Sequence, residues 1–485
     1  MEEELLKEEL QSINVDSSND NNKKEIFEDI SLDNITLDKP VTFQEALTIL
    51  TKSAYHKTLY CDHEIISNGI PELKKDKKLG IFINVTIPYV APFSNGKYTI
   101  SSFDVQIPFF GNKKRLSDLE VQPFFNIEES DKFIERSKKF VKLTEKPYYC
   151  HVEGYMYIPT MGGMKRLPLN SRVVVDPSGY KKYKNADRWY SNDEMDKIPE
   201  EIFISTLPTV PVYSLEYREW GEVPVEQIKD IVFDETAFER TVLPQDYKDR
   251  IYNLVTNFYK TECIDFIAGK KRGLVFLLMG NPGTGKTLTA QGISELCHRP
   301  LYSVGTGDLG TDPATIEKRL QMIFDMVGKW NGIVLIDEAD VFMAERVDHD
   351  VKYNACVSVF LRLIESYFGI LFLTTNRDHS IDKAFDSRIH IRLRYSDLEK
   401  DGRSLVWKES LTRYNIKDID VDELSKFVLN NREIANIVQL AFLEVGGDAS
   451  KVDQQLLINY IILRENFKNN NVLKVNVIQN EEIIV

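Results

Sequence analysis

The residues that point most clearly to chemistry lie in the stretch GNPGTGKTLTAQ, residues 280–291. Its glycines allow successive backbone N–H groups to turn inward toward an anion. Lys286 supplies a cation for the outer phosphates of a nucleotide, and Thr287 supplies a hydroxyl for Mg²⁺. The G-x-x-x-x-G-K-T spacing predicts a phosphate-binding loop. The alternative is an ordinary glycine turn with an exposed lysine.

The nucleotide is expected to lie against the whole of this loop and the first residues of the following helix. The predicted contacts are Gly280, Asn281, Pro282, Gly283, Thr284, Gly285, Lys286, Thr287 and Leu288.

Two carboxylates and an amide follow two further apolar runs. The run Ile333–Ile336 ends in Asp337 and Glu338, and Ile370–Thr374 leads into Asn376. Ligands of open α/β sheets bind at the carboxyl ends of the strands. This placement suits Asp337 to hold Mg²⁺, Glu338 to polarise an attacking water, and Asn376 to hold that water against a γ-phosphate. A solvated loop start and a turn asparagine are the alternatives.

The segments around the loop indicate how it is positioned. Residues 274–279 read LVFLLM, a continuous apolar run whose length is typical of a buried strand in a parallel sheet. Residues 288–296 have helical character, and the N-terminus of such a helix attracts anions. The predicted order of strand, glycine loop and helix is the context that a phosphate loop requires.

Residues 233–395 resemble an AAA+ ATPase module. The resemblance rests on FIAGKKRGLVFLLMGNPGTGKTLTAQ, RPLYSVGTGDLGT, LIDEADVFMAER and GILFLTTNRDHSIDKAFDSRIHIRL. More narrowly, the chain resembles a group common in fungi, in which a single module follows a β-rich domain of unknown function. The implied fold is a P-loop α/β sheet with a C-terminal helical lid. The implied cofactors are ATP and Mg²⁺.

The resemblance also implies residue roles. It identifies Gly280–Thr287 as the phosphate loop, Asp337 and Glu338 as the metal and water residues, and Asn376 as the first sensor. It implies that Arg388, in FDSRI, is an arginine finger that reaches the γ-phosphate of a neighbouring subunit in a ring, expected to be a hexamer. Asn281 stands where a proline is usual, which leaves the amide geometry of the loop little changed.

A second departure concerns client handling. Many AAA+ unfoldases carry an aromatic–hydrophobic–glycine loop that faces a central pore and grips extended polypeptide. The corresponding segment, residues 307–320, reads GDLGTDPATIEKRL and contains no aromatic residue. Peptide threading is therefore in doubt, whereas remodelling by domain motion stays open.

The length of 485 residues predicts two or three domains. Positions 1–40 hold 12 acidic and 4 basic residues, a net charge of −8, and the other 445 positions hold 63 and 57, a net charge of −6. We expect an acidic disordered tail over 1–40, a β-rich domain over 41–225, the nucleotide-binding domain over 226–395, and a helical lid with a tail over 396–485.

The β-rich domain is predicted from segments of strand composition separated by Gly, Pro and Asn clusters. The predicted strands are 81–90, 103–110, 148–158 and 172–176, with one helix over 133–143. Two pieces, RLSDLEVQPFF and LNSRVVVDPSGY, resemble the domain that precedes the ATPase in the fungal group. Residues 209–224, TVPVYSLEYREWGEVP, are interpreted as a proline-punctuated link to the ATPase region.

The region after residue 395 turns helical. We expect helices over 403–413, 421–430, 432–445 and 451–467, packed as a lid over the nucleotide. Arg432 sits where such lids place a second sensor for the γ-phosphate, and a surface arginine at a helix start is an equal alternative. Phe266 and Ile267 are candidates to cover the adenine ring, although an apolar helix end explains them as well.

Other site types are disfavoured. Cys61, His63, Cys150 and His151 offer metal ligands but lack the usual zinc spacing, so ordinary β-domain residues are the better interpretation. Basic runs such as YKKYKNADRWY interleave with aromatics, as in single-strand binders, but solvated turns explain them and the acidic body argues against nucleic acid.

No apolar run reaches the length of a membrane span, the acidic start is no secretory signal, and the cysteines form no C-x-x-C pair. We expect an intracellular, soluble protein in the cytoplasm or nucleus. The prediction is an ATPase that remodels a protein client. Two alternatives stay open: an ATP-controlled binding switch, and a nucleic-acid-stimulated loader.

Overall fold

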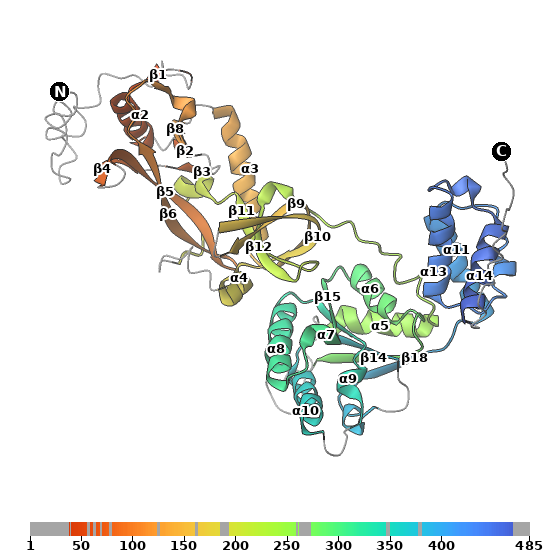
Figure 1. Cartoon of the computed structure of the whole chain (residues 1–485). Coiled ribbons are helices and arrows are strands. Elements are labelled where there is room, and N and C mark those ends of the chain that lie inside the picture. Colours follow the sequence, from red (N-terminus) through yellow and green to blue (C-terminus); the bar gives the residue numbers. More distant parts are fainter. Residues whose placement is uncertain are drawn as a thin grey trace, which may run out of the picture. The chain divides into compact units, whose positions relative to one another are not determined.

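The chain divides into two compact units, Met1–Ile231 and Val232–Val485. A computed structural model (Figure 1) describes residues 38, 40–55, 59–61, 65–67, 70–76, 80–123, 127–160, 163–184, 194–258, 260, 273–345, 350–376 and 381–468. Most of the expected acidic tail lies outside these ranges. Among the described helices, none is long and apolar enough to cross a membrane.

The first unit is built mainly from antiparallel strands. Its largest sheet contains β9 (Tyr148–Thr160), β10 (Gly163–Val175), β11 (Thr209–Ser214), β12 (Glu219–Pro224) and β13 (Ile228–Lys229). The order is β10-β11-β12-β9-β13, and β9 also pairs with β10. Because β9 pairs with both β10 and β12, the sheet closes on itself.

A second sheet of this unit has the order β4-β5-β6, formed by Ile70–Asp76, Gly80–Ser94 and Lys97–Pro108. Smaller pairings join β1 (Pro40–Val41) to β7 (Lys114–Arg115), and β2 (Leu59–Cys61) to β3 (Ile65–Ser67) and β8 (Val121–Pro123). The helices are α2 (Phe43–Tyr55), α3 (Ile127–Thr144) and α4 (Pro177–Lys184). The predicted β-rich character and the helix within α3 are confirmed.

The interpretation of residues 209–224 as a link is wrong. These residues form β11 and β12, a hairpin in which Val210, Val212 and Val223 are fully buried. The prediction rested on the prolines, which are uncommon within strands. Pro211 and Pro224 nevertheless occupy paired strand positions without breaking the hairpin. Nearly continuous burial along both strands outweighs the two missing backbone donors here.

The second unit begins with a parallel sheet. The order is β15-β16-β17-β14-β18, with β14 at Leu274–Gly280, β15 at Leu301–Gly305, β16 at Ile333–Asp337, β17 at Ile370–Thr375 and β18 at Ile391–Tyr395. Every pairing in it is parallel. The predicted buried strands are confirmed, and their continuous apolar runs reflect burial on both faces.

Helices cover both faces of this sheet. On one face, α5 (Gln245–Phe258) and α6 (Lys286–Leu296) pack with alternate strand residues such as Phe276, Leu335 and Phe372. The remaining helices are α7 (Thr306–Leu309), α8 (Pro313–Lys329), α9 (Asp340–Met343) and α10 (Val351–Ser366). In Figure 1, α8 and α10 lie together as a pair, apart from α5 and α6.

A helical lid follows the sheet, with its own core around the fully buried Trp407. It contains α11 (Lys400–Arg413), α12 (Val421–Leu424), α13 (Asn431–Glu444) and α14 (Gln454–Lys468). The helix predicted over 421–430 is wrong in length, because α12 ends at Leu424. Asn430 has extended backbone (φ −91°, ψ 170°) and caps α13, so the chain leaves the helical conformation before it. The predicted C-terminal tail lies outside the described residues.

Candidate functional site

The glycine loop leaves β14 in a conformation that few side chains tolerate. Gly280 has φ +145°, and a Cβ there would lie 2.4 Å from the carbonyl oxygen of Tyr395 on β18. Gly283 and Gly285 have φ +79° and +100°. These three glycines let the backbone turn between β14 and α6, and α6 begins at Lys286, two residues before the predicted helical stretch 288–296.

Lys286 is buried within the loop and joins it to another strand. Its side chain is 7% exposed, and its Nζ donates to the carbonyl oxygens of Gly280 at 2.6 Å and Asn281 at 2.8 Å. The same Nζ lies 2.9 Å from Oδ1 of Asn376, which follows β17. The ammonium is therefore held at the carboxyl ends of two neighbouring strands, where a phosphate would meet it.

The two acidic residues at the end of β16 have different surroundings. Thr287 Oγ1 lies 3.3 Å from each carboxylate oxygen of Asp337, which is half-buried. A hydroxyl and a carboxylate at this separation are the oxygen donors that Mg²⁺ prefers. Glu338 is exposed and has φ +53°, an uncommon backbone conformation for a residue with a side chain. The turn directs two successive carboxylates to different positions.

Sequence reasoning missed a residue that holds this turn. The Thr374 hydroxyl donates to Oδ1 of Asp337 and accepts from the Glu338 backbone N–H at 2.9 Å. Thr374 is 1% exposed, at the carboxyl end of β17. The available signal was a pair of hydroxyl residues, Thr374 and Thr375, at the end of an otherwise apolar strand that follows the acidic pair in the chain.

Asn376 is exposed just beyond β17. Its backbone N–H donates to Oδ1 of Asp340 at 3.2 Å, and its side-chain oxygen faces Lys286. The structure therefore brings Lys286, Thr287, Asp337 and Asn376 into one connected group. Glu338 joins this group through its backbone.

Among the described residues of its own chain, the contacts of Arg388 are with side chains and carbonyls outside this group. Its Nη2 pairs with Oε2 of Glu365 at 2.8 Å, and Nη1 donates to the carbonyl of Ala384 at 2.7 Å and to Ser387 Oγ at 3.2 Å. Its side chain is 26% exposed. Glu365 belongs to α10, so the arginine is oriented by the end of that helix.

The lid touches the phosphate loop through the start of α13. The Asn431 N–H donates to the carbonyl of Gly283 at 3.1 Å, and a Cβ on Gly283 would lie 2.6 Å from Oδ1 of Asn430. Arg432 is exposed in the first turn of α13, and Glu433 beside it forms the capping box with Asn430 and an ion pair with Arg464. The residues that contact the loop are thus the two asparagines before Arg432.

Some predicted features lie elsewhere. Phe266, Ile267 and His63 fall outside the described residues. Burial raises the pKa of the Cys150 thiol to about 12, and His151 pairs with Asn170 at 2.9 Å. Among the described residues, no group of three or more His, Cys, Asp or Glu side chains is arranged to hold a metal ion. Of the basic run at 180–190, residues 180–184 belong to α4, where Lys184 pairs with Glu219 at 2.9 Å, and residues 185–190 lie outside the described residues.

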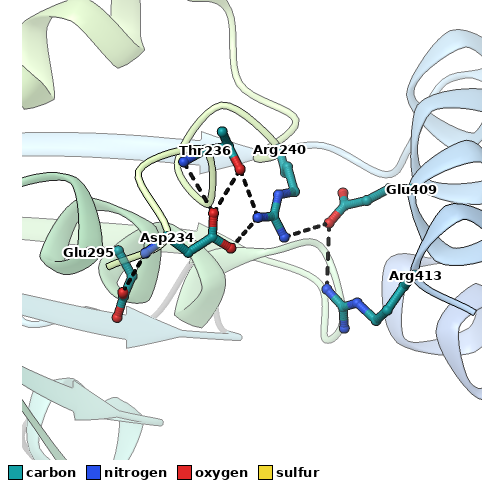
Figure 2. Close-up of polar contacts among 6 residues, drawn as sticks. All are labelled: Asp234, Thr236, Arg240, Glu295, Glu409 and Arg413. Carbon is teal, nitrogen blue, oxygen red and sulfur yellow. Dashed lines mark hydrogen bonds and ion pairs between the residues drawn. The ribbon is translucent and has the colours of Figure 1, made fainter. Parts of the chain in front are cut away.

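The segment before α5 binds both parts of the second unit (Figure 2). The Asp234 N–H donates to Glu295 on α6 at 3.1 Å, and the Asp234 carboxylate accepts from Thr236 and pairs with Arg240. Arg240 also pairs with Glu409 on α11 at 3.6 Å. This linker therefore joins the parallel-sheet part of the second unit, through α6, to the helical lid, through α11.

Replacing Arg240 with alanine is expected to destabilise the second unit by about 1 kcal/mol, because one guanidinium links the linker to α11. Urea unfolding at low and high salt measures the effect, which salt should reduce. Arg413→Ala is the matched control: Arg413 also contacts Glu409 at 3.6 Å but is 64% exposed and does not contact the linker residues in Figure 2. Equal stability of the two variants would contradict a joining role for Arg240.

The chain is similar to known proteins over the region that contains this site. Residues 276–396 match the family model "ATPase family associated with various cellular activities (AAA)". The chain is similar to a putative 26S proteasome regulatory subunit homolog of Methanothermobacter thermautotrophicus, with 24% identity over 33% of this chain and 46% of the relative. It is also similar to katanin p60 ATPase-containing subunit A1 of Strongylocentrotus purpuratus, with 25% identity over 32% of each protein.

The chain thus spans less than half the length of these two curated relatives. Among solved structures, the crystal structure of the FIGL-1 AAA domain aligns with 48% of this chain and 85% of its own, at 17% identity and a TM-score of 0.39. The family match runs from within β14 to the end of β18, and so includes the glycine loop and the acidic turn.

Proposed function

We propose that this chain, which contains an AAA family ATPase domain, hydrolyses ATP with Mg²⁺ and uses the energy to remodel a protein client. The observation that carries the proposal is the direct contact of Lys286 Nζ with Asn376 Oδ1 at 2.9 Å, beside the Thr287–Asp337 contact. Groups from three strand ends meet there, as phosphoryl transfer requires.

Each residue has a distinct task in this proposal. The loop amides and Lys286 bind the β- and γ-phosphates, and the start of α6 adds its positive end. Asn376 orients the attacking water and Glu338 polarises it. When bound, Mg²⁺ neutralises charge on the phosphate oxygens, and Thr287 and Asp337 would hold it. Arg432 is a second-sensor candidate at the first turn of α13.

The same proposal includes a ring. Arg388 supports it, because an arginine beyond the β17 loop suits the planar recognition of a neighbour's γ-phosphate oxygens. A homo-oligomeric ring, a hexamer by resemblance, would place the Arg388 of one subunit at the site of the next. From the same sequence resemblance, the chain would belong to the fungal group in which a β-rich domain of unknown function precedes a single ATPase module.

Two other functions make different predictions. A binding switch would turn ATP over slowly and without stimulation, whereas a remodelling ATPase shows steady hydrolysis that its client accelerates. A loader would be stimulated by single-stranded DNA or RNA. Trapping Glu338→Gln protein with ATP and identifying what co-purifies addresses the client. Stimulation of wild-type turnover by that partner is the expected result, and stimulation by nucleic acid alone would overturn the proposal of a protein client.

The segment after β15 makes a further prediction. Residues 306–312 contain the short helix α7 and a turn before α8, and no aromatic side chain among them is available to grip a chain. We therefore expect the protein not to unfold a tagged, stably folded model protein while it hydrolyses ATP. Fluorescence of the substrate and phosphate release, followed in one sample, measure this. ATP-dependent unfolding that is lost on replacing residues 307–317 would contradict it.

A further inference from the structure

The acidic turn after β16 lies where the ladder between two strands stops. The pairs of β16 and β17 run from Ile333↔Ile370 to Ile336↔Leu373. Beyond Leu373, the next residue of β17 contacts three successive residues on the other side. Thr374 bonds the Asp337 carboxylate and the Glu338 N–H through its hydroxyl, and the Ala339 N–H through its carbonyl at 2.8 Å.

The Thr374 hydroxyl donates one hydrogen bond and accepts another, as its two side-chain partners require. A threonine hydroxyl has one proton and accepts through its lone pairs. The proton goes to Oδ1 of Asp337, and a lone pair takes the Glu338 N–H at 2.9 Å. At 1% exposure, water does not replace either bond. One buried atom therefore couples the metal-ligand candidate to the backbone of the water-polarising candidate.

Glu338 needs such a constraint. Its φ of +53° is unfavourable for a residue with a Cβ, and such conformations persist only where surrounding contacts fix them. The flanking amides at Glu338 and Ala339 are both bound by Thr374. Without the hydroxyl, the turn loses the bond nearest to the unfavourable φ, and the Glu338 side chain takes new directions.

We propose that Thr374 is a positioning residue for ATP hydrolysis: its hydroxyl sets the separation and direction of the Asp337 and Glu338 carboxylates. This inference rests on the proposed ATPase function. Thr374 touches neither nucleotide nor water in the proposal and acts through the acidic turn. Positioning partners of this kind commonly change activity by about 10–100-fold.

Thr374→Val tests the proposal, because valine keeps the β-branched shape and removes the hydroxyl. We expect kcat to fall about 10–100-fold, with the KM for ATP changing less than about threefold. Thr374→Ser keeps the hydroxyl and should stay within about threefold of the parent. Thr241→Val is the matched control: it removes another buried threonine hydroxyl, which bonds the Phe238 carbonyl at 2.7 Å in the linker.

A second readout does not depend on activity. In chelator without nucleotide, exchange of the Glu338 amide hydrogen should be about tenfold faster in Thr374→Val, while amides inside β16 keep their protection. Unchanged kcat in Thr374→Val, or equal damage in Thr374→Ser, overturns the role of the hydroxyl. If Thr374→Val does not fold, the serine variant and Thr374→Ala decide by the same measurements. A parent protein without any ATP turnover would instead refute the proposed function itself.

Discussion

Glu338→Gln is expected to keep ATP bound and to stop its hydrolysis. Glutamine retains the shape of the side chain on its exposed turn but removes the charge that polarises water. Loss of a general base typically lowers kcat by about 10²–10⁴-fold. Nucleotide affinity should stay within about threefold, because the carboxylate takes no part in holding phosphate.

Lys286→Ala is expected to lose ATP binding, the step that precedes hydrolysis. The ammonium is buried among two loop carbonyls and Asn376, so its removal takes away both a cation and the contacts that hold the loop. Losing one partner of a buried charge pair costs about 3–5 kcal/mol, which corresponds to a dissociation constant raised by about two to four orders of magnitude.

Titration with a fluorescent nucleotide and phosphate release under saturating ATP separate the two steps. Lys318→Ala is a matched control, since Lys318 is an exposed lysine of α8 in the same domain. It should bind and hydrolyse like the parent. Equal loss of nucleotide affinity in Glu338→Gln and Lys286→Ala would contradict the separate roles.

Arg388→Ala is expected to bind ATP normally and to hydrolyse it about 10³–10⁵-fold more slowly, the range known for arginine fingers. In its own chain Arg388 pairs with Glu365 at 2.8 Å, so action on a phosphate of the next subunit requires the guanidinium to exchange partners. Arg392→Ala serves as the control, because Arg392 pairs with Asp386 nearby on an exposed strand edge.

Mixing Arg388→Ala with Glu338→Gln discriminates action in trans. In one of the two mixed neighbour arrangements, an intact Arg388 meets a site with an intact Glu338. Two variants that are inactive alone should then recover part of the activity together. If subunits exchange and the mixture stays inactive at every ratio, Arg388 does not act on a neighbour. If Arg388→Ala hydrolyses ATP like the parent, its ion pair with Glu365 is its main role, and the ring loses its support.

The parallel sheet and its loops could be predicted from sequence because each strand is a continuous apolar run that ends at a polar residue. Phe276 and Phe372, whose ring centroids lie 4.5 Å apart, occupy paired strands that the apolar pattern alone identified. The positions of Lys286 and Asp337 follow from strand ends, since parallel strands present these ends at one edge.

Other features depend on contacts that no local pattern contains. The hairpin at 209–224 was predicted as a link because it contains two prolines. Their positions within strands depend on pairing with neighbouring strands. The early end of α12 follows from Asn430, which serves as the cap of the next helix. The role of Thr374 depends on the packing of β17 beside β16. This packing brings Thr374 next to Glu338, which lies 36 residues earlier in the chain. The roles of these residues depend on tertiary contacts, so a single sequence could not predict these roles.

The contact between the lid and the phosphate loop has a thermodynamic consequence. The Gly283 carbonyl holds the Asn431 N–H, and Gly283 leaves no room for a side chain beside Asn430. If nucleotide on the loop changes the preferred angle of the lid by some free energy, then fixing that angle changes nucleotide affinity by the same amount. Any neighbour, client or antibody that immobilises α13 is thus also an effector of ATP affinity, with a coupling factor that must be identical when measured from either side.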